Sequence, residues 1–283
     1  MKKAEAVLMV NSKCNKSCKM CYLEYTGERS PEDALDAVKS LKEQGFKVTI
    51  AGSETLFNPG YLKAYKEAGQ DYLLTNGLIL LQKPELFSMM RDAGIKMLGF
   101  SIQFNNPELE CLPESVVAEV IYASQEQGFK TQVKTIITPN NYRSVEEICT
   151  RAVNYGIDSQ KFLRFVESGR AKGQKQYLIT SEQKLDFFNQ VVEARKKFPK
   201  TVLDIIMYGG FGPRPGSKGE PLALANKYCP GGIDFFAISP DNKVYNCPFA
   251  MTKPIGEFID GKIRVERILL PDKRTDCVAD LIN

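Results

Sequence analysis

The amino-acid sequence predicts an α/β protein, in which a partial (β/α)6 barrel is followed by a small domain made of a β-hairpin and a helix. Two observations predict this fold. Short apolar runs typical of strands alternate with helical patterns at intervals of about 25 residues. The alternation stops near residue 207, where a stretch rich in glycine and proline begins. We therefore expect the barrel over residues 1–207 and the smaller domain over residues 208–283.

Six apolar runs are expected to form the parallel strands of the barrel, and a seventh run follows them. These runs are residues 6–10, 47–51, 72–75, 96–104, 129–137 and 161–166, and then 202–207. The first helix has clear boundaries, because Ser30 is a typical N-cap, Pro31 suits the first helical position and Gly45 suits the end. Similar boundaries predict helices at 58–69, 84–94, 113–128 and 144–156. Sites in such folds lie beyond the carboxyl ends of the strands.

The C-terminal part has a different pattern. Two strand-like runs, 233–239 and 243–246, flank the sequence Pro240-Asp241-Asn242, which predicts a hairpin with an Asp-Asn turn. The final polar run, 270–283, is expected to be helical at its end.

The composition excludes several classes of function. The 283 residues include no histidine, which excludes a Ser-His-Asp triad, imidazole acid–base catalysis and histidine-ligated metal. A net charge of +4 that is spread along the chain does not indicate a nucleic-acid surface. No apolar run approaches the roughly 18 to 20 residues of a membrane span. The N-terminal apolar stretch is too short for a secretion signal, so we expect a cytoplasmic protein.

Three of the eight cysteines, Cys14, Cys18 and Cys21, follow the first predicted strand with the spacing C-x3-C-x2-C. A loop of this length can bend three thiolates around one iron–sulfur cluster. Three ligands leave one iron of a four-iron cluster open to a substrate or cofactor. A zinc knuckle or unligated thiols are the alternatives, although no histidine exists to complete a zinc site.

At this loop the sequence resembles the radical S-adenosylmethionine (SAM) family, over about residues 6–207. The resemblance lies in Cys14-Asn-Lys-Ser-Cys18-Lys-Met-Cys21, followed by Tyr22, on a chain of βα repeats. It implies a [4Fe–4S] cluster that binds SAM, reductive cleavage of SAM to a 5′-deoxyadenosyl radical, and removal of hydrogen from a substrate. It also implies that Met20 and Tyr22 lie in the cofactor site.

Two further loops resemble parts of this family. The segment 51–55 is similar to the family's Gly-Gly-Glu-Pro motif, which implies that Gly52, Ser53 and Glu54 hold the amino group of SAM. It departs from the motif at Ser53 and Thr55, and an ordinary turn with a solvated Glu54 is the alternative. Thr75 and Asn76 end the third strand in a Thr-Asn-Gly sequence that is common in family members.

Polar residues on later strands complete the expected cofactor site. Ser101 and Gln103 share one face of the fourth strand, from which they would reach the carboxylate or ribose of SAM. Lys134 on the fifth strand would neutralise the same carboxylate, or would face solvent. Arg164 and Arg170, the latter in a Gly-Arg segment similar to one in relatives with extra clusters, are weaker candidates, because exposed arginines are common.

The C-terminal cysteines resemble the Twitch half of a SPASM/Twitch extension, which implies a second, auxiliary [4Fe–4S] cluster. Its expected ligands are Cys229, Cys247 and Cys277, with Asp280 as a fourth ligand or an open iron in its place. A structural zinc site is the alternative. Of the remaining cysteines, Cys149 is expected in the core, and Cys111 is a hydrogen-atom donor or a bystander thiol.

The substrate is less clearly indicated. The first strand begins near residue 6, so no N-terminal peptide-recognition domain is expected. We expect oxidation or epimerisation of a small polar molecule such as an aminocyclitol or sugar alcohol. The alternatives are modification of a ribosomally made peptide, by epimerisation or cross-linking, and an iron–sulfur or zinc protein without a substrate. The expected redox partner is an external one-electron donor such as flavodoxin or ferredoxin.

Overall fold

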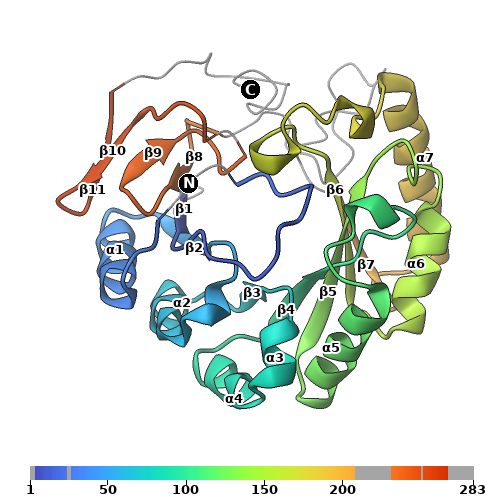
Figure 1. The fold of residues 1–283 in the computed structure, drawn as a ribbon, viewed down its shortest axis with the longest axis horizontal. Helices are drawn as coiled ribbons and strands as arrows, with labels where there is room; N and C mark the ends of the chain where they lie inside the picture. Colours follow the sequence, from blue (N-terminus) through green and yellow to red (C-terminus); the bar gives the residue numbers. More distant parts are fainter. Residues whose placement is uncertain (1–3, 24–26, 208–230, 250, 267–283) are drawn as a thin grey trace.

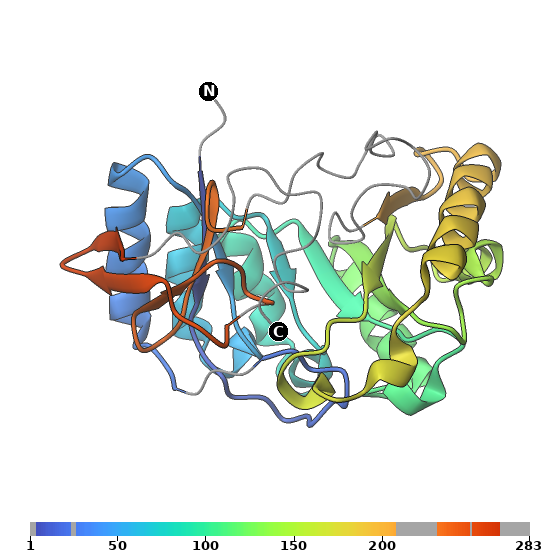
Figure 2. The same cartoon turned by 90° about the horizontal axis from the view of Figure 1, so that it is seen from above.

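In a computed structural model, strands β1 to β7 curve into an incomplete ring with helices α1 to α7 on its outside (Figure 1). The structure describes residues 4–23, 27–207, 231–249 and 251–266. Seen from above in Figure 2, the C-terminal strands lie at the side of the ring that carries α1. No helix in these ranges is long and apolar enough to span a membrane.

The strands are β1 (Glu5–Met9), β2 (Lys47–Ala51), β3 (Tyr72–Leu74), β4 (Met97–Ser101), β5 (Lys130–Ile137), β6 (Ser159–Arg164), β7 (Asp204–Met207), β8 (Phe235–Ile238), β9 (Lys243–Tyr245), β10 (Gly256–Ile259) and β11 (Lys262–Val265). The helices are α1 (Pro31–Glu43), α2 (Leu62–Ala68), α3 (Leu78–Gln82), α4 (Glu85–Asp92), α5 (Glu114–Glu126), α6 (Val145–Asn154) and α7 (Ser181–Lys197).

The ring is built from two sheets that meet between β2 and β3. One sheet has the order β3-β4-β5-β6-β7 and is parallel throughout, and the other begins with β2 beside β1. The side chain of Gln70 bridges the junction. Its Oε1 accepts a hydrogen bond from Ile50 N at 2.6 Å, and its Nε2 donates to Ile50 O at 3.2 Å and to Tyr72 O at 2.8 Å. One amide thus satisfies backbone groups of both strands where the ladder is interrupted.

Replacing Gln70 with methionine, which keeps the length of the side chain, is expected to lower the free energy of unfolding by about 2 kcal/mol, because three partly buried backbone groups lose their partner. Chemical denaturation measures this change. Gln82→Met on an exposed part of α3 is the control and should change stability by less than about 0.5 kcal/mol. Equal stability of the two variants would show that Gln70 does not join the sheets.

The C-terminal strands continue the sheet of β1, in the order β11-β10-β9-β8-β1-β2. β8 pairs in parallel with β1, from Glu5 beside Phe235 to Leu8 beside Ile238. β8 and β9 form the predicted antiparallel hairpin, with Asn242 in its turn at a φ of 66°. The structure therefore confirms that a β-rich region follows the parallel strands. The helix predicted at the end of the final run lies outside the described residues.

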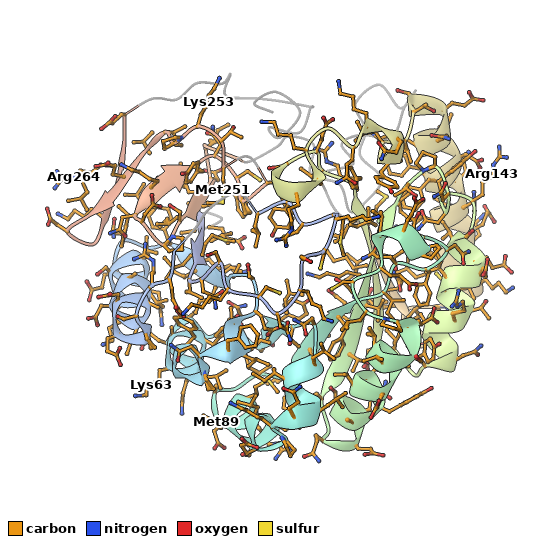
Figure 3. All side chains as sticks on the ribbon, in the orientation of Figure 1. Lys63, Met89, Arg143, Met251, Lys253 and Arg264 are labelled. Carbon is orange, nitrogen blue, oxygen red and sulfur yellow. The ribbon has the colours of Figure 1, made fainter. Side chains whose placement is uncertain are left out.

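The main core lies between the strands and the helices. Phe100, Val133 and Phe162 are almost fully buried on the helix-facing side of β4 to β6, where Phe162 packs edge-on against Phe187 of α7. A second apolar cluster, which includes Val7, Met9 and Met251, lies on the other face of β1. In Figure 3, Lys63, Arg143 and Arg264 point away from the ring, whereas Met251 lies toward its inside.

Several elements differ from the expectations. The strand predicted at 96–104 ends at Ser101, and Asn105 takes a φ of 59° soon after it, so the chain turns away from the sheet. The helix predicted at 58–69 is a short 3-10 turn, Pro59–Tyr61, followed by α2. Sequence reasoning missed α3, α7 and the hairpin of β10 and β11, although Thr180 and Gln183 form a capping box at the start of α7.

Candidate active site

The loop that follows β1 carries Cys14, Cys18 and Cys21 and crosses the inside of the ring (the blue segment in Figure 1). Backbone hydrogen bonds fix both of its ends: Val10 N donates to Ala51 O at 2.8 Å, and Arg29 N donates to Val10 O at 2.8 Å. The three thiols are therefore presented at the carboxyl end of β1, where parallel α/β folds place their sites.

The charges near the loop affect its thiols differently. Burial raises the pKa of Cys14, and the charges of Glu54, Cys18 and Cys21 raise it further. A hydrogen bond from the Cys111 thiol, aided by the charges of Arg170 and Lys16, lowers the pKa of Cys18 to about 7 against the opposing effect of burial. A lowered pKa favours the thiolate, which is the form that binds metal.

A segment after β6 holds this loop from the other side. Arg170 N donates to Cys21 O at 2.9 Å, and Arg170 Nε donates to Cys18 O at 3.1 Å. Gln174 Nε2 donates to Lys19 O at 3.1 Å. Arg170, which the sequence predicts as a SAM-binding residue, thus uses Nε and its backbone N–H to hold the backbone between Cys18 and Cys21.

Gly169 allows this close approach. Its φ is +58°, and a Cβ at this position would lie 2.6 Å from Leu23 O and 2.7 Å from Cys21 O. Any other residue would push the loop away, because the obstructing atoms are backbone.

Glu54 is fully buried, which excludes the alternative of a solvated side chain. Its carboxylate accepts hydrogen bonds from Asn76 N at 2.8 Å, from Thr75 Oγ1 at 3.0 Å and from Leu56 N at 3.4 Å. Burial raises its pKa, and these donors oppose the rise. Glu54 therefore connects the loop after β2 to the end of β3.

The neighbouring residues connect the same loops to the cysteines. Ser53 N donates to Asn11 Oδ1 at 3.1 Å, and a Cβ on Gly52 would lie 2.6 Å from this oxygen. Asn76 Nδ2 donates to Asn15 Oδ1 at 2.8 Å and lies 3.9 Å from Cys14 Sγ. The structure thus brings Gly52, Ser53, Glu54, Thr75 and Asn76 together beside the cysteine loop.

The family of the protein follows from its sequence together with this site. Residues 8–166, more than half of the chain, match the profile of the Radical SAM superfamily. The chain belongs to the radical SAM superfamily. Comparison with curated protein sequences gives no match.

Solved structures support this radical SAM fold. SuiB of Streptococcus suis, bound to precursor peptide SuiA, superposes with a TM-score of 0.69 at 15% identity, over 93% of this chain and 62% of SuiB. The chain therefore spans about three-fifths of the length of SuiB. The protein anSMEcpe with bound AdoMet gives a TM-score of 0.66 at 16% identity, over 90% of this chain and 78% of anSMEcpe. Its complex with AdoMet and Cp18Cys peptide gives 0.65 at 16% identity, over 92% and 78% of the two chains.

The [4Fe–4S] cluster and SAM are the cofactors of radical SAM enzymes, and the residues present fit them. The segment from Cys14 to Cys21 supplies three thiols and contains no carboxylate, and its backbone is held on both sides. Within the described ranges, no three Cys, Asp or Glu side chains converge on one point as metal ligands do. A [4Fe–4S] cluster is ligated at separate irons, so its three thiols do not have to meet at a single point.

Cys111 lies against the cysteine loop, and Met20 is part of that loop. The hydrogen bond to Cys18 raises the pKa of Cys111, so the hydrogen of this thiol is directed at the loop. Met20 packs against an apolar cluster that contains Phe165 and Tyr177. Cys149 is fully buried in the core, as predicted.

Tyr22 and Cys247 connect the cysteine loop to the C-terminal strands. Burial raises the pKa of Tyr22, and the charges of Cys21 and Cys247 raise it further. The Tyr22 ring lies 4.4 Å from that of Phe249, measured between centroids. Tyr22 thus lies close to both Cys21 and Cys247. The other predicted auxiliary ligands, Cys229, Cys277 and Asp280, lie outside the described residues.

Asn246, next to Cys247, is consistent with a metal–sulfur group near this thiol. Asn246 is 2% exposed, and its Nδ2 has no hydrogen-bond partner among the residues that the structure describes. A Cβ on Gly232 would overlap Asn246 Oδ1, so the amide lies tightly against this glycine. A buried N–H donor without a partner is costly, and the sulfur of a bound cluster would be an acceptor for it.

The remaining predicted residues divide into two groups. Ser101 and Lys134 lie side by side on the inner faces of β4 and β5. Gln103 lies beyond the end of β4, is 3% exposed and accepts a hydrogen bond from Ile136 N at 2.9 Å. By strand alternation, Arg164 is on the face of β6 that carries Phe162. The structure therefore does not place Gln103 on a strand with Ser101, and it places Arg164 on the opposite face from Lys134.

Sequence reasoning missed the loop contacts of Asn15 and Gln174, the buried amide of Asn246 and the inner position of Lys161. The alternation of β6 was enough to predict the inner position of Lys161. It is the neighbour of the apolar Phe162, and neighbouring residues of a strand point to opposite faces of the sheet.

Proposed function

We propose that this radical SAM enzyme cleaves SAM reductively and uses the resulting radical to remove hydrogen from a peptide substrate. The observation that carries the proposal is the cysteine loop, which is anchored to β1, to the segment after β6 and to the loops that contain Glu54 and Asn76. A loop fixed on three sides keeps its thiols in one place, as cofactor binding requires.

Each group of residues has a separate role in this proposal. When bound, the cluster supplies the electron that breaks the C5′–S bond of SAM, giving methionine and a 5′-deoxyadenosyl radical. Cys14, Cys18 and Cys21 ligate the cluster, while Gly169 and Arg170 fix the loop. Glu54, Thr75 and Asn76 shape the part of the site that receives the methionyl end of SAM, and Ser101 lies on the inner wall beside it.

The peptide substrate is supported by the fold comparisons. SuiB bound to precursor peptide SuiA and anSMEcpe bound to Cp18Cys peptide each superpose on more than nine-tenths of this chain. A small polar substrate, our first expectation from the sequence, has no comparable support. The kinds of modification in the proposal are epimerisation and cross-linking, and the electron donor is an external protein such as flavodoxin or ferredoxin.

An auxiliary [4Fe–4S] cluster on Cys229, Cys247 and Cys277, with Asp280 as a further ligand, completes the proposal. It is supported by the proximity of Cys247 to Tyr22 and by the unpartnered amide of Asn246. This second cluster would accept an electron from the substrate radical or bind the substrate.

Anaerobic reconstitution with iron and sulfide, followed by dithionite and SAM, tests the proposal. We expect about eight irons per chain and formation of 5′-deoxyadenosine. Cys247→Ala should lose about four irons and retain the SAM-binding cluster, whereas Cys149→Ala is the control with an unchanged iron count. A filled cluster that yields no 5′-deoxyadenosine would contradict the radical mechanism. Mass spectrometry of short peptides encoded beside the gene and co-expressed with the enzyme tests the substrate class.

A further inference from the structure

Three side chains lie in a row across the inner faces of β4, β5 and β6. Ser101 pairs in register with Lys134, and Lys134 pairs with Lys161. Register partners on parallel strands are about 5 Å apart and point to the same side of the sheet. The two ammonium groups therefore belong to one site.

The row faces the inside of the ring and not the helices. The alternating residues Phe100, Val133 and Phe162 are each at most 1% exposed and pack in the core beneath the helices. Because side chains alternate along a strand, Lys134 and Lys161 point to the opposite, inner side. Both are partly buried there.

Neither lysine has an acidic partner among the described residues. No ion pair or hydrogen bond joins either ammonium group to another side chain in this part of the structure. The ammonium group of Lys134 lies over the ring of Tyr72, whose centroid is 5.3 Å from Nζ. The carboxylate that acts on Lys161 is that of Glu5, which lies beyond ion-pair distance and accepts a hydrogen bond from Thr49 Oγ1 at 2.7 Å.

The polar layer next to the lysines is already satisfied. Tyr72 Oη donates to Gln132 Oε1 at 3.1 Å, and Gln132 Nε2 donates to Ser159 Oγ at 3.1 Å. Gly99 is required for this arrangement, because a Cβ there would overlap the Tyr72 hydroxyl. Tyr72, Gln132 and Ser159 form hydrogen bonds with one another and none with the two ammonium groups. The N–H groups of Lys134 and Lys161 therefore remain available to a ligand.

Two adjacent cations without an ion-pair partner among the described residues are unfavourable in this position. Burial lowers the pKa of Lys134, and the charge of Lys161 lowers it further; burial also lowers the pKa of Lys161. A buried charge normally has a partner, and a bound oxyanion would supply one to both lysines.

We infer that Lys134 and Lys161 bind an anionic group of the substrate, a carboxylate or a phosphate, on the inner wall of the ring. The inference rests on the proposed function, in which the substrate is a peptide. It adds that this peptide carries an acidic group close to the residue from which hydrogen is removed. The inner wall at β1 is apolar, with Val7, Met9 and Met251, of which Figure 3 labels Met251, so an apolar side chain next to the acidic one is compatible with this wall.

Calorimetric titration of the reconstituted enzyme in the presence of SAM tests the inference. The probes are glutarate, inorganic phosphate and the neutral analogue glutaramide. We expect glutarate to bind and glutaramide not to bind, and we expect Lys134→Met and Lys161→Met each to raise the Kd for glutarate at least about tenfold. Tighter binding of phosphate than of glutarate would support the inference and would identify the anionic group of the substrate as a phosphate.

The matched control is Lys130→Met, on the same strand and face but exposed at its amino end, which should leave the Kd for glutarate unchanged. Removing the unpaired charge in Lys134→Met should also raise the Tm by about 2 to 4 °C, which shows that the variant folds. The Kd for SAM is measured in parallel. Equal binding of glutarate and glutaramide, or a Lys134→Met variant that loses affinity for SAM but keeps it for glutarate, would overturn the inference. Because the titration requires no SAM cleavage, its outcome is independent of the radical chemistry.

Discussion

Gly169→Ala is expected to lower 5′-deoxyadenosine formation at least about hundredfold, because the added Cβ would displace the cysteine loop by a fraction of an ångström or more. The methyl group would lie 2.6 to 2.7 Å from carbonyl atoms of Cys21, Tyr22 and Leu23, and these backbone atoms can yield only if the loop moves. Arg170 would then lose its hydrogen bonds to Cys18 O and Cys21 O. We expect the iron content after reconstitution to fall with the activity.

Gly173→Ala is the control for this prediction. Gly173 lies four residues further along the same segment, with a φ of +80° and no atom within 4 Å of an added Cβ. Both substitutions carry the strain of a left-handed conformation, about 1 kcal/mol, but only one of them obstructs the cysteine loop. Similar iron content and activity in the two variants would show that backbone strain, and not displacement of the loop, causes any loss.

Glu54→Gln is expected to lower the free energy of unfolding by about 2 kcal/mol and to weaken SAM binding at least about tenfold. The carboxylate accepts hydrogen bonds from Asn76 N, Thr75 Oγ1 and Leu56 N. A glutamine amide would turn its NH2 group toward one of the two backbone N–H groups in either orientation, so one buried donor would lose its acceptor.

Chemical denaturation and equilibrium binding of SAM measure the two effects of Glu54→Gln. Glu67→Gln is the control, because Glu67 is an exposed carboxylate whose partner is Lys42 on the surface, and it should change stability by less than about 0.5 kcal/mol. A Glu54→Gln variant with the stability and SAM affinity of the wild type would remove Glu54 from the site.

The local features of the fold were predictable from the sequence, because strand alternation and helix caps act over a few residues. Ser30 caps α1 through a hydrogen bond from Asp33 N, as its position before Pro31 predicted. The end of β4 at Ser101 was not predictable, because the apolar residues Ile102 and Phe104 continue the strand pattern. They are buried without belonging to the sheet.

The sequence indicated the candidate site where short spacing marks it, as for Cys14, Cys18 and Cys21. It also indicated Glu54 and Asn76, which belong to short motifs in two neighbouring loops. The site was not predictable where a contact joins distant parts of the chain. The contact of Arg170 with Cys18 spans 152 positions, and no local pattern distinguishes such an arginine from a solvated one. Lys161 was missed for a different reason: the alternation of β6 indicates its face, but a single lysine on a strand usually faces water.

The pairing of β8 with β1 has a consequence for the order in which the protein matures. β1 is made first, but its second neighbour in the sheet is not synthesised until residues 235–238 leave the ribosome. Arg29, which follows the cysteine loop, likewise donates to Ser239 O at 2.8 Å across 210 positions of the chain. The base of the cysteine loop is therefore completed only after residues 210 positions further along the chain have been synthesised. Insertion of the cluster into a nascent chain would precede the contacts that hold the loop in place, so metal loading belongs after translation.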